Sequence, residues 1–90
     1  MDAIHCTVSG KVQGVYFRAW TRDAARRIGL SGWVRNLPDG RVEAVAAGSA
    51  EQLDAFKRAL QEGSPLSRVS AVDCEAADPN GLPDPFEVRY

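Results

Sequence analysis

The chain has 90 residues and a mass of 9.7 kDa, which suits one domain over residues 1–90 with a modest hydrophobic core. Hydrophobic residues make up 44% and charged residues 26%, so the composition excludes a disordered or collagen-like chain. The 11 basic and 12 acidic residues give a net charge of -1, which argues against a broad nucleic-acid-binding or membrane-binding surface. Because there is neither a secretory leader pattern nor an apolar run long enough to span a bilayer, we expect a cytoplasmic protein.

The two cysteines, Cys6 and Cys74, are too few and too far apart for a disulfide scaffold or a zinc site. Free cysteine is usually buried, so we expect two reduced, half-buried thiols. A single bridge between them is the alternative, and it depends on how the strands that carry them are ordered.

The first two expected elements are a strand and a helix. Residues 3–9 alternate apolar and polar side chains, a period of two that predicts a strand with one buried face. After a loop from Gly10, apolar residues recur at spacings of three and four, which predicts an amphipathic helix ending at Gly29. The apolar positions are Phe17, Trp20, Ala24 and Ile28. The other side of this helix is charged, and we interpret its arginines as solvated surface residues. These arginines are Arg22, Arg26 and Arg27.

A hairpin and a second helix are expected next. Residues 32–36 predict a short strand, and a Leu-Pro-Asp-Gly turn separates it from residues 41–47, which return as the antiparallel partner. Ser49 and Gln52 have the spacing of a capping box, which predicts a helix that ends near Gly63.

Two strands complete the expected fold. Residues 68–75 predict a fourth strand and residues 86–90 a short fifth one, after a loop rich in Pro, Gly and Asp. The order βαββαβ with an added C-terminal strand is the α+β, ferredoxin-like split β-α-β arrangement, an antiparallel sheet with both helices on one face. Enzymes, RNA-binding domains and ligand sensors share this topology, so fold alone does not give function.

The connection from Ser9 to Arg18 is a candidate anion site, because it contains glycines and runs directly into a helix N-terminus. Free backbone N–H groups and the positive end of the helix dipole suit a group the size of phosphate. A cation such as Arg18 in the first turn is repelled by the dipole, by about 0.3–1 kcal/mol, unless an anion is bound. Its guanidinium also matches two phosphate oxygens. The alternative is a plain connecting loop with one of the chain's nine arginines nearby.

Asn36 ends the second expected strand, where asparagine is also favoured simply as the cap of a turn. If the first two strands share a sheet, Asn36 approaches the loop, and its amide can hold a water in line with a bound phosphorus. His5 is the only histidine, and without a partner evident in the sequence we interpret it as structural. An enzyme with these parts has no protein nucleophile, metal or general base, so it acts only on an activated substrate.

Two segments of this sequence resemble the signatures of a known family. Residues 10–18, GKVQGVYFR, resemble the first signature of the acylphosphatases, and residues 32–36, GWVRN, resemble the second. Residues 86–90, FEVRY, are similar to the family's closing strand, so the likeness spans nearly the whole chain.

The resemblance implies a small cytosolic hydrolase that cleaves an acyl phosphate to a carboxylate and inorganic phosphate, without a metal or other cofactor. In that family the loop amides and the arginine of the first signature hold the phosphate, and the asparagine of the second orients the attacking water. Carried over to this sequence, the catalytic residues are Arg18 and Asn36. The phosphate-binding residues are Gln13, Gly14, Val15, Tyr16, Phe17 and Arg18.

Two other classes of function use the same topology. An RNA-binding domain needs adjacent aromatic residues on its central strands, and residues 41–47 have none. A sensor that binds phosphate without cleaving it is the stronger alternative. We expect a monomer whose partners are a small-molecule acyl phosphate and phosphate, with no nucleic acid and no membrane.

Overall fold

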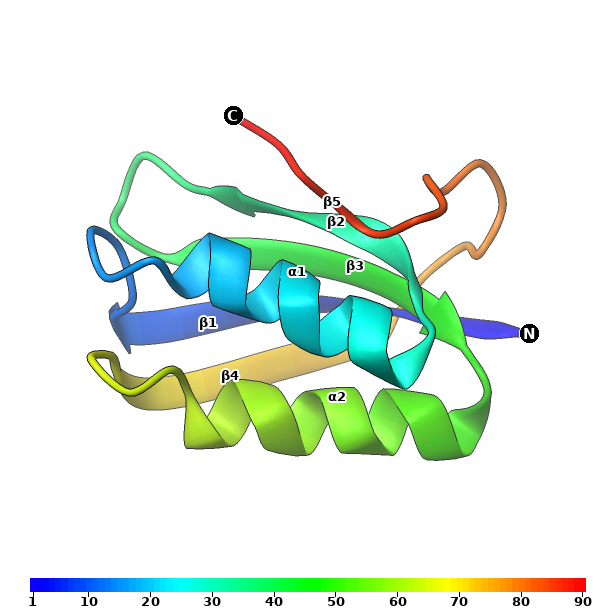
Figure 1. Cartoon of the computed structure of the whole chain (residues 1–90), viewed down its shortest axis with the longest axis horizontal. Coiled ribbons are helices and arrows are strands. Elements are labelled where there is room, and N and C mark those ends of the chain that lie inside the picture. The colour runs from blue at the N-terminus through cyan, green and yellow to red at the C-terminus, as the bar shows by residue number, and fades with distance from the viewer.

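The computed structural model describes every residue from Met1 to Tyr90 and contains five strands and two helices (Figure 1). The elements follow the predicted order and lie close to the predicted bounds, although the fifth strand is shorter than expected. In chain order they are β1 (Asp2–Lys11), α1 (Phe17–Ile28), β2 (Ser31–Asn36), β3 (Val42–Gly48), α2 (Ala50–Glu62), β4 (Arg68–Ala76) and β5 (Glu87–Val88).

The strands form one sheet in the order β4-β1-β3-β2-β5, and both helices cover the same face of it (Figure 1). The first four strands pair in antiparallel fashion, as predicted. The fifth strand differs from the prediction, because β5 pairs with β2 in parallel. Residues 77–86 carry the chain from β4 at one edge of the sheet to β5 at the other edge, beside β2.

The hydrophobic core lies between the sheet and the helices. On β1 the core residues are Ile4, Cys6 and Val8, the alternating set that the period of two predicts. Helix α1 contributes Phe17 and α2 contributes Phe56, with 1% and 0% of their surfaces exposed. Since Phe17 is the first residue of α1, its burial holds the start of this helix, and the loop before it, against the sheet.

The two helices differ in how they begin. At the start of α2 the Ser49 hydroxyl accepts a hydrogen bond from the Gln52 N–H, and the Gln52 side chain accepts one from the Ser49 N–H. These bonds satisfy N–H groups that a helix leaves unpaired, and they confirm the predicted capping box. Helix α1 has the predicted left-handed Gly29 at its end, with φ 97°, but no side-chain cap at its start.

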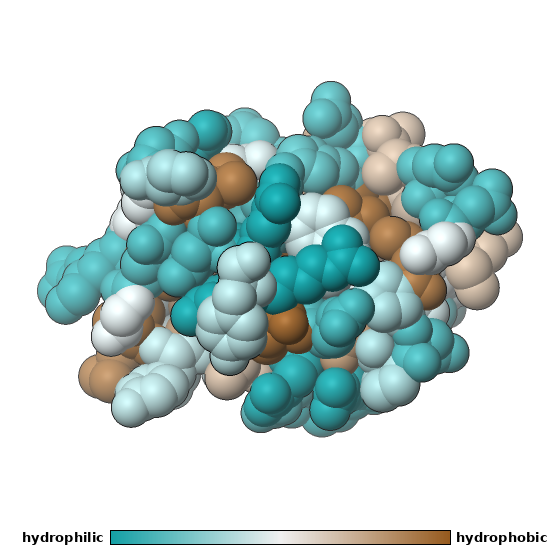
Figure 2. All heavy atoms as spheres, turned by 90° about the horizontal axis from the view of Figure 1, so that it is seen from above, coloured by the Kyte–Doolittle hydropathy of each residue, from teal (hydrophilic) through white to brown (hydrophobic).

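The surface has few large apolar side chains. Seen from above Figure 1, where β5 lies, the molecule is mostly hydrophilic and its hydrophobic residues form small separate patches (Figure 2). The exposed large hydrophobic residues are Met1, Tyr16, Leu66 and Tyr90. Neither helix is long and apolar enough to cross a bilayer.

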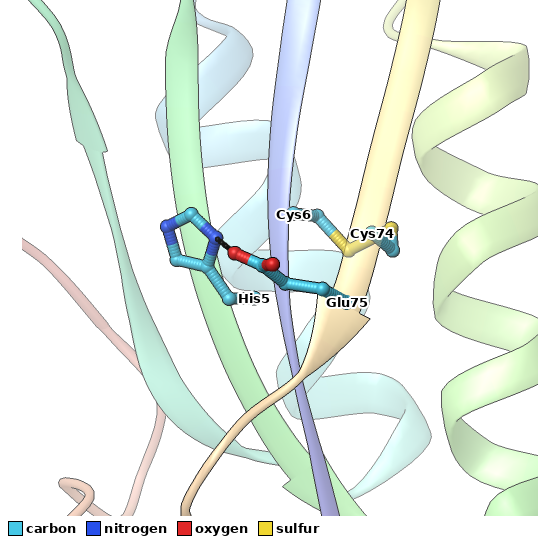
Figure 3. The surroundings of a disulfide bond; sticks show 4 residues. All are labelled: His5, Cys6, Cys74 and Glu75. Atoms are coloured by element: carbon cyan, nitrogen blue, oxygen red, sulfur yellow. Dashed lines mark ion pairs between the residues drawn. A yellow bond between two sulfur atoms is a disulfide. The ribbon is translucent and has the colours of Figure 1, made fainter.

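A disulfide joins Cys6 of β1 to Cys74 of β4 (Figure 3). The two residues are directly opposite each other in the antiparallel pairing, with their Cα atoms 4.1 Å apart. The expectation of two reduced thiols is therefore wrong, and the single bridge is correct. The register between strands from opposite ends of the chain decides this, and that register leaves no local signal in the sequence.

Reducing this disulfide should destabilise the fold, because it cross-links residues that are 68 positions apart. Such a link restricts the unfolded chain and contributes about 2–4 kcal/mol to the free energy of unfolding. We expect a dithiol reductant to lower the urea midpoint of the wild type. The Cys74→Ser variant should have the lower midpoint without reductant and should not respond to it. A wild-type midpoint that is the same with and without reductant contradicts this account.

Candidate active site

The loop between β1 and α1 has an unusual backbone. Gly14 and Tyr16 both lie in the left-handed region, with φ 73° and 57°, and Tyr16 is the only residue other than glycine with a positive φ. For a tyrosine this conformation costs about 1–2 kcal/mol, so the surrounding structure must impose it. Left-handed residues in such a turn direct successive N–H groups toward one side, which is how backbone anion sites are built.

The N–H groups at this end of α1 have no partners from the protein. Tyr16 is the N-cap but makes no side-chain cap hydrogen bond, and the first turn contains no acidic residue. None of the loop residues from Gln13 to Tyr16 donates its backbone N–H to another group. In contrast to α2, the positive end of α1 is therefore left open, and Arg18 adds a full positive charge to it.

Gln13 fastens the loop to the turn between β2 and β3. Its side-chain Nε2 donates to the carbonyl oxygens of Leu37 and Arg41, both at 2.9 Å. This contact brings the loop to the end of β2, where Asn36 lies. The Gln13 side-chain NH₂ group is thus occupied in positioning the loop, which leaves its backbone N–H as the donor for a ligand.

Arg18 and Asn36 line the same hollow, which has a volume of about 470 Å³ and which we call the α1 hollow. Of the other residues predicted to bind phosphate, Gly14, Tyr16 and Phe17 also line it. Gln13 and Val15 do not. Val15 instead packs, partly buried, against the core. The complete lining consists of Val12, Gly14, Tyr16, Phe17, Arg18, Ala19, Arg22, Asn36, Val88 and Tyr90.

The Arg18 guanidinium is held by the C-terminal segment and not by a carboxylate. Its Nη1 donates to the Arg89 carbonyl oxygen at 3.4 Å, and its Cζ lies 4.7 Å from the centre of the Tyr90 ring. Neither contact neutralises the positive charge. Arg18 is therefore held in place while its charge stays available for an anion.

Asn36 is the last residue of β2, and its side-chain Oδ1 is buried without a hydrogen-bond partner. A buried acceptor in this state costs about 1–3 kcal/mol. Buried polar atoms in native proteins are almost always paired, so an unpaired oxygen on a residue that lines the hollow marks Asn36 as a candidate for a contact with water or substrate. The amide is not used as the cap of the following turn, which was the alternative interpretation.

Two of the three α1 arginines interpreted as solvated surface residues have other positions or contacts in the structure. The Arg26 Nε donates to the Phe86 carbonyl oxygen at 2.8 Å and so fastens the chain just before β5 to the helix. Arg22 lines the α1 hollow. Only Arg27 is exposed without a hydrogen bond, as expected for all three. Arg22 follows Arg18 by four positions, about one helical turn, and that spacing is the signal that could have placed Arg22 beside Arg18.

His5 lies on the face of the sheet opposite the helices and has two carboxylate partners. Its Nε2 is 2.7 Å from Glu43 Oε2 on β3. Its Nδ1 is 3.4 Å from Glu75 Oε1 on β4 (Figure 3). These partners could not be inferred from the sequence, because they come from strands far along the chain. His5 therefore has the partners that the sequence-based interpretation denied it; it does not line the α1 hollow, and its contacts link β1 to β3 and β4.

Comparison with known proteins identifies the family. A family model described as Acylphosphatase matches residues 4–88. This chain belongs to the acylphosphatase family. Membership makes the chain an enzyme, and the family's solved structures have the same ferredoxin-like fold.

Individual acylphosphatases are similar to this chain in sequence and in structure. The one from Rubrobacter xylanophilus is 55% identical over 82 residues, which cover 91% of this chain and 74% of that protein. The one from Natronomonas pharaonis is 53% identical over 85 residues, covering 94% and 91%. The crystal structure of acylphosphatase from Bacillus subtilis matches with a TM-score of 0.94 at 36% identity, and each chain is covered in full.

In this member of the acylphosphatase family, Glu43 gives the fold a dependence on pH. Burial by itself raises the pKa of Glu43, but hydrogen bonds from His5 and Arg35 outweigh it and hold the pKa below its ordinary value. A carboxyl with a depressed folded pKa stabilises the fold above its unfolded pKa of about 4.3 and loses that effect as pH falls through the folded pKa.

We therefore expect Glu43→Gln to be less stable than the wild type near neutral pH, and the difference in free energy of unfolding to shrink as pH falls below about 4.3. Urea unfolding at a series of pH values measures this difference. Glu62→Gln, which changes an exposed carboxylate of α2, is the control and should show no such convergence. A Glu43→Gln difference that stays constant down to about pH 3 would falsify the assignment.

Proposed function

We propose that this chain hydrolyses the carboxyl–phosphate bond of acyl phosphates in the α1 hollow, with Arg18 holding the phosphate and Asn36 orienting the attacking water. The observation that carries the proposal is that these two side chains, from α1 and from the end of β2, line one hollow. The family supports acyl phosphate hydrolysis as the overall reaction.

The open end of α1 suits the phosphate group. The unpaired N–H groups between Gln13 and Tyr16 are donors fixed before any ligand arrives, so binding requires little rearrangement. Arg18 adds a planar pair of donors and a full charge. Phosphoryl transfer asks a protein mainly for positioning and for stabilisation of charge on the phosphate oxygens, and these groups supply both.

Asn36 suits the water. Its buried Oδ1 lacks a partner, and a water O–H group is the smallest donor that satisfies it. An amide donates as well as accepts, so it can fix the direction of a water lone pair toward phosphorus. Holding the water in line with the breaking bond replaces a random encounter with an oriented one.

The reaction balances without a protein nucleophile. The water oxygen forms a bond to phosphorus while the bond from phosphorus to the carboxyl oxygen breaks, and the carboxylate leaves with the bonding electrons. The water proton passes to a phosphate oxygen, because the lining of the α1 hollow includes no carboxylate side chain and no histidine. The products are a carboxylate and inorganic phosphate.

Replacing Arg18 by alanine should nearly abolish hydrolysis of benzoyl phosphate, because it removes the only full charge placed on the phosphate. Loss of one preorganised donor typically lowers kcat by about 10²–10³, and a charged donor should exceed that. Inhibition by inorganic phosphate should weaken in parallel. Arg58→Ala on α2, an exposed arginine outside the hollow, is the control and should keep full activity.

Asn36→Ala should lower kcat to a similar extent but leave inhibition by phosphate unchanged, because Asn36 acts on the water and not on the phosphate. Asn80→Ala, in the exposed loop before β5, is the matched control. The two assays separate the roles, since only Arg18→Ala should affect phosphate. A reversed pattern overturns the assignment, and a folded wild type without any turnover leaves a phosphate-binding sensor.

A further inference from the structure

Arg22 is a second cation in the α1 hollow that the proposed phosphate site does not use. It follows Arg18 by one helical turn, which places both arginines on the same side of α1. Both line the hollow, and no aspartate or glutamate is part of its lining. The hollow therefore combines two positive side chains with no negative one.

The guanidinium of Arg22 has donors to spare. Its Nε donates to Asp23 Oδ1 at 3.0 Å, and its two terminal nitrogens make no hydrogen bond. Asp23 is 63% exposed, so this is a surface ion pair worth at most about 1 kcal/mol. The Arg22 side chain is 35% exposed, less than the 47% of Arg35 and the 48% of Arg41.

The α1 hollow is larger than a phosphate group. Its volume of about 470 Å³ lies in the range of roughly 300–1,000 Å³ that is typical of sites for whole small molecules. Apolar and aromatic residues supply most of the rest of the lining, with Val12, Val88, Tyr16 and Tyr90 among them. A phosphate held at the start of α1 thus leaves room for the acyl part of the substrate alongside the next turn of the helix, where Arg22 lies.

We propose that Arg22 is a specificity-determining residue that contacts a negatively charged group on the acyl part of the substrate. The preferred substrates are then acyl phosphates with a second anionic group, such as a carboxylate or a phosphate on the acyl chain. Two like charges one turn apart repel each other, and a substrate with two anionic groups relieves this repulsion at both positions. The inference rests on the proposed function, because a phosphate held by Arg18 is what places the acyl group near Arg22.

The test compares two kinds of substrate on the same protein. Benzoyl phosphate has a neutral acyl group, whereas 3-carboxybenzoyl and 4-carboxybenzoyl phosphate add one carboxylate to the same ring. We expect Arg22→Gln to lower the ratio of kcat/KM for a carboxybenzoyl phosphate to that for benzoyl phosphate by about tenfold for at least one isomer, the order of one charge-assisted hydrogen bond. The loss should appear mainly as a higher KM. Since each ratio is taken on one protein preparation, a smaller folded fraction does not change it.

Two control variants and one rescue sharpen the result. Arg58→Gln makes the same change in net charge away from the hollow, and Asp23→Asn removes the ion pair while keeping Arg22, so neither should lower the ratio. Arg22→Lys should restore part of it. An unchanged ratio in Arg22→Gln for both isomers overturns the role of Arg22, as does an equal fall in either control. A wild type that hydrolyses benzoyl phosphate with an unchanged ratio in Arg22→Gln overturns only this inference, whereas a wild type that hydrolyses none of the three overturns the proposed function itself.

Discussion

The open start of α1 is the constraint on which the rest of the site depends. Three local costs meet in this hollow: Arg18 opposes the helix dipole by about 0.3–1 kcal/mol, Tyr16 in the left-handed region costs about 1–2 kcal/mol, and the unpaired Asn36 oxygen costs about 1–3 kcal/mol. Together these costs are a sizeable fraction of the stability of a small domain. A bound phosphate reverses the first, and a water on Asn36 removes the last. The arrangement therefore makes physical sense as a site prepared for a ligand, and local exceptions of this kind are typical of functional sites.

The sheet edge formed by the parallel strands β2 and β5 supplies the residues that hold Arg18. Because β5 pairs in parallel with β2, the two residues after it, Arg89 and Tyr90, lie beside the start of α1. There the Arg89 carbonyl and the Tyr90 ring hold Arg18. The strand itself has only two residues, too few to be stable alone. Arg26 compensates by bonding the Phe86 carbonyl, and Phe86 is itself fully buried in the core. Helix α1 thus holds the C-terminal segment through Arg26, and that segment holds Arg18 of the same helix. The stability of the β5 edge is therefore coupled to the position of Arg18.

The sequence predicts most of the fold, because most elements depend on local signals. The periodicities, the capping box of α2 and the Gly29 cap are all encoded within a few neighbouring residues. What the sequence could not reveal depends on distant pairing: the parallel fifth strand, the disulfide between Cys6 and Cys74, and the partners of His5. In the candidate site, the shared position of Arg18 and Asn36 follows from topology and could be predicted. The use of the Gln13 side chain as a tie to the β2–β3 turn could not, because it requires the position of that turn relative to the loop.

The central claim is that the unpaired N–H groups at the start of α1 bind the phosphate. Titration of ¹⁵N-labelled protein with inorganic phosphate, followed by ¹H–¹⁵N correlation spectra, tests it at the level of single backbone groups. Saturable shifts are expected for the amides of residues 13–18, and none for the capped first turn of α2 at residues 50–53. Saturable shifts confined to another part of the chain, or no shift at the start of α1 at saturating phosphate, would contradict it.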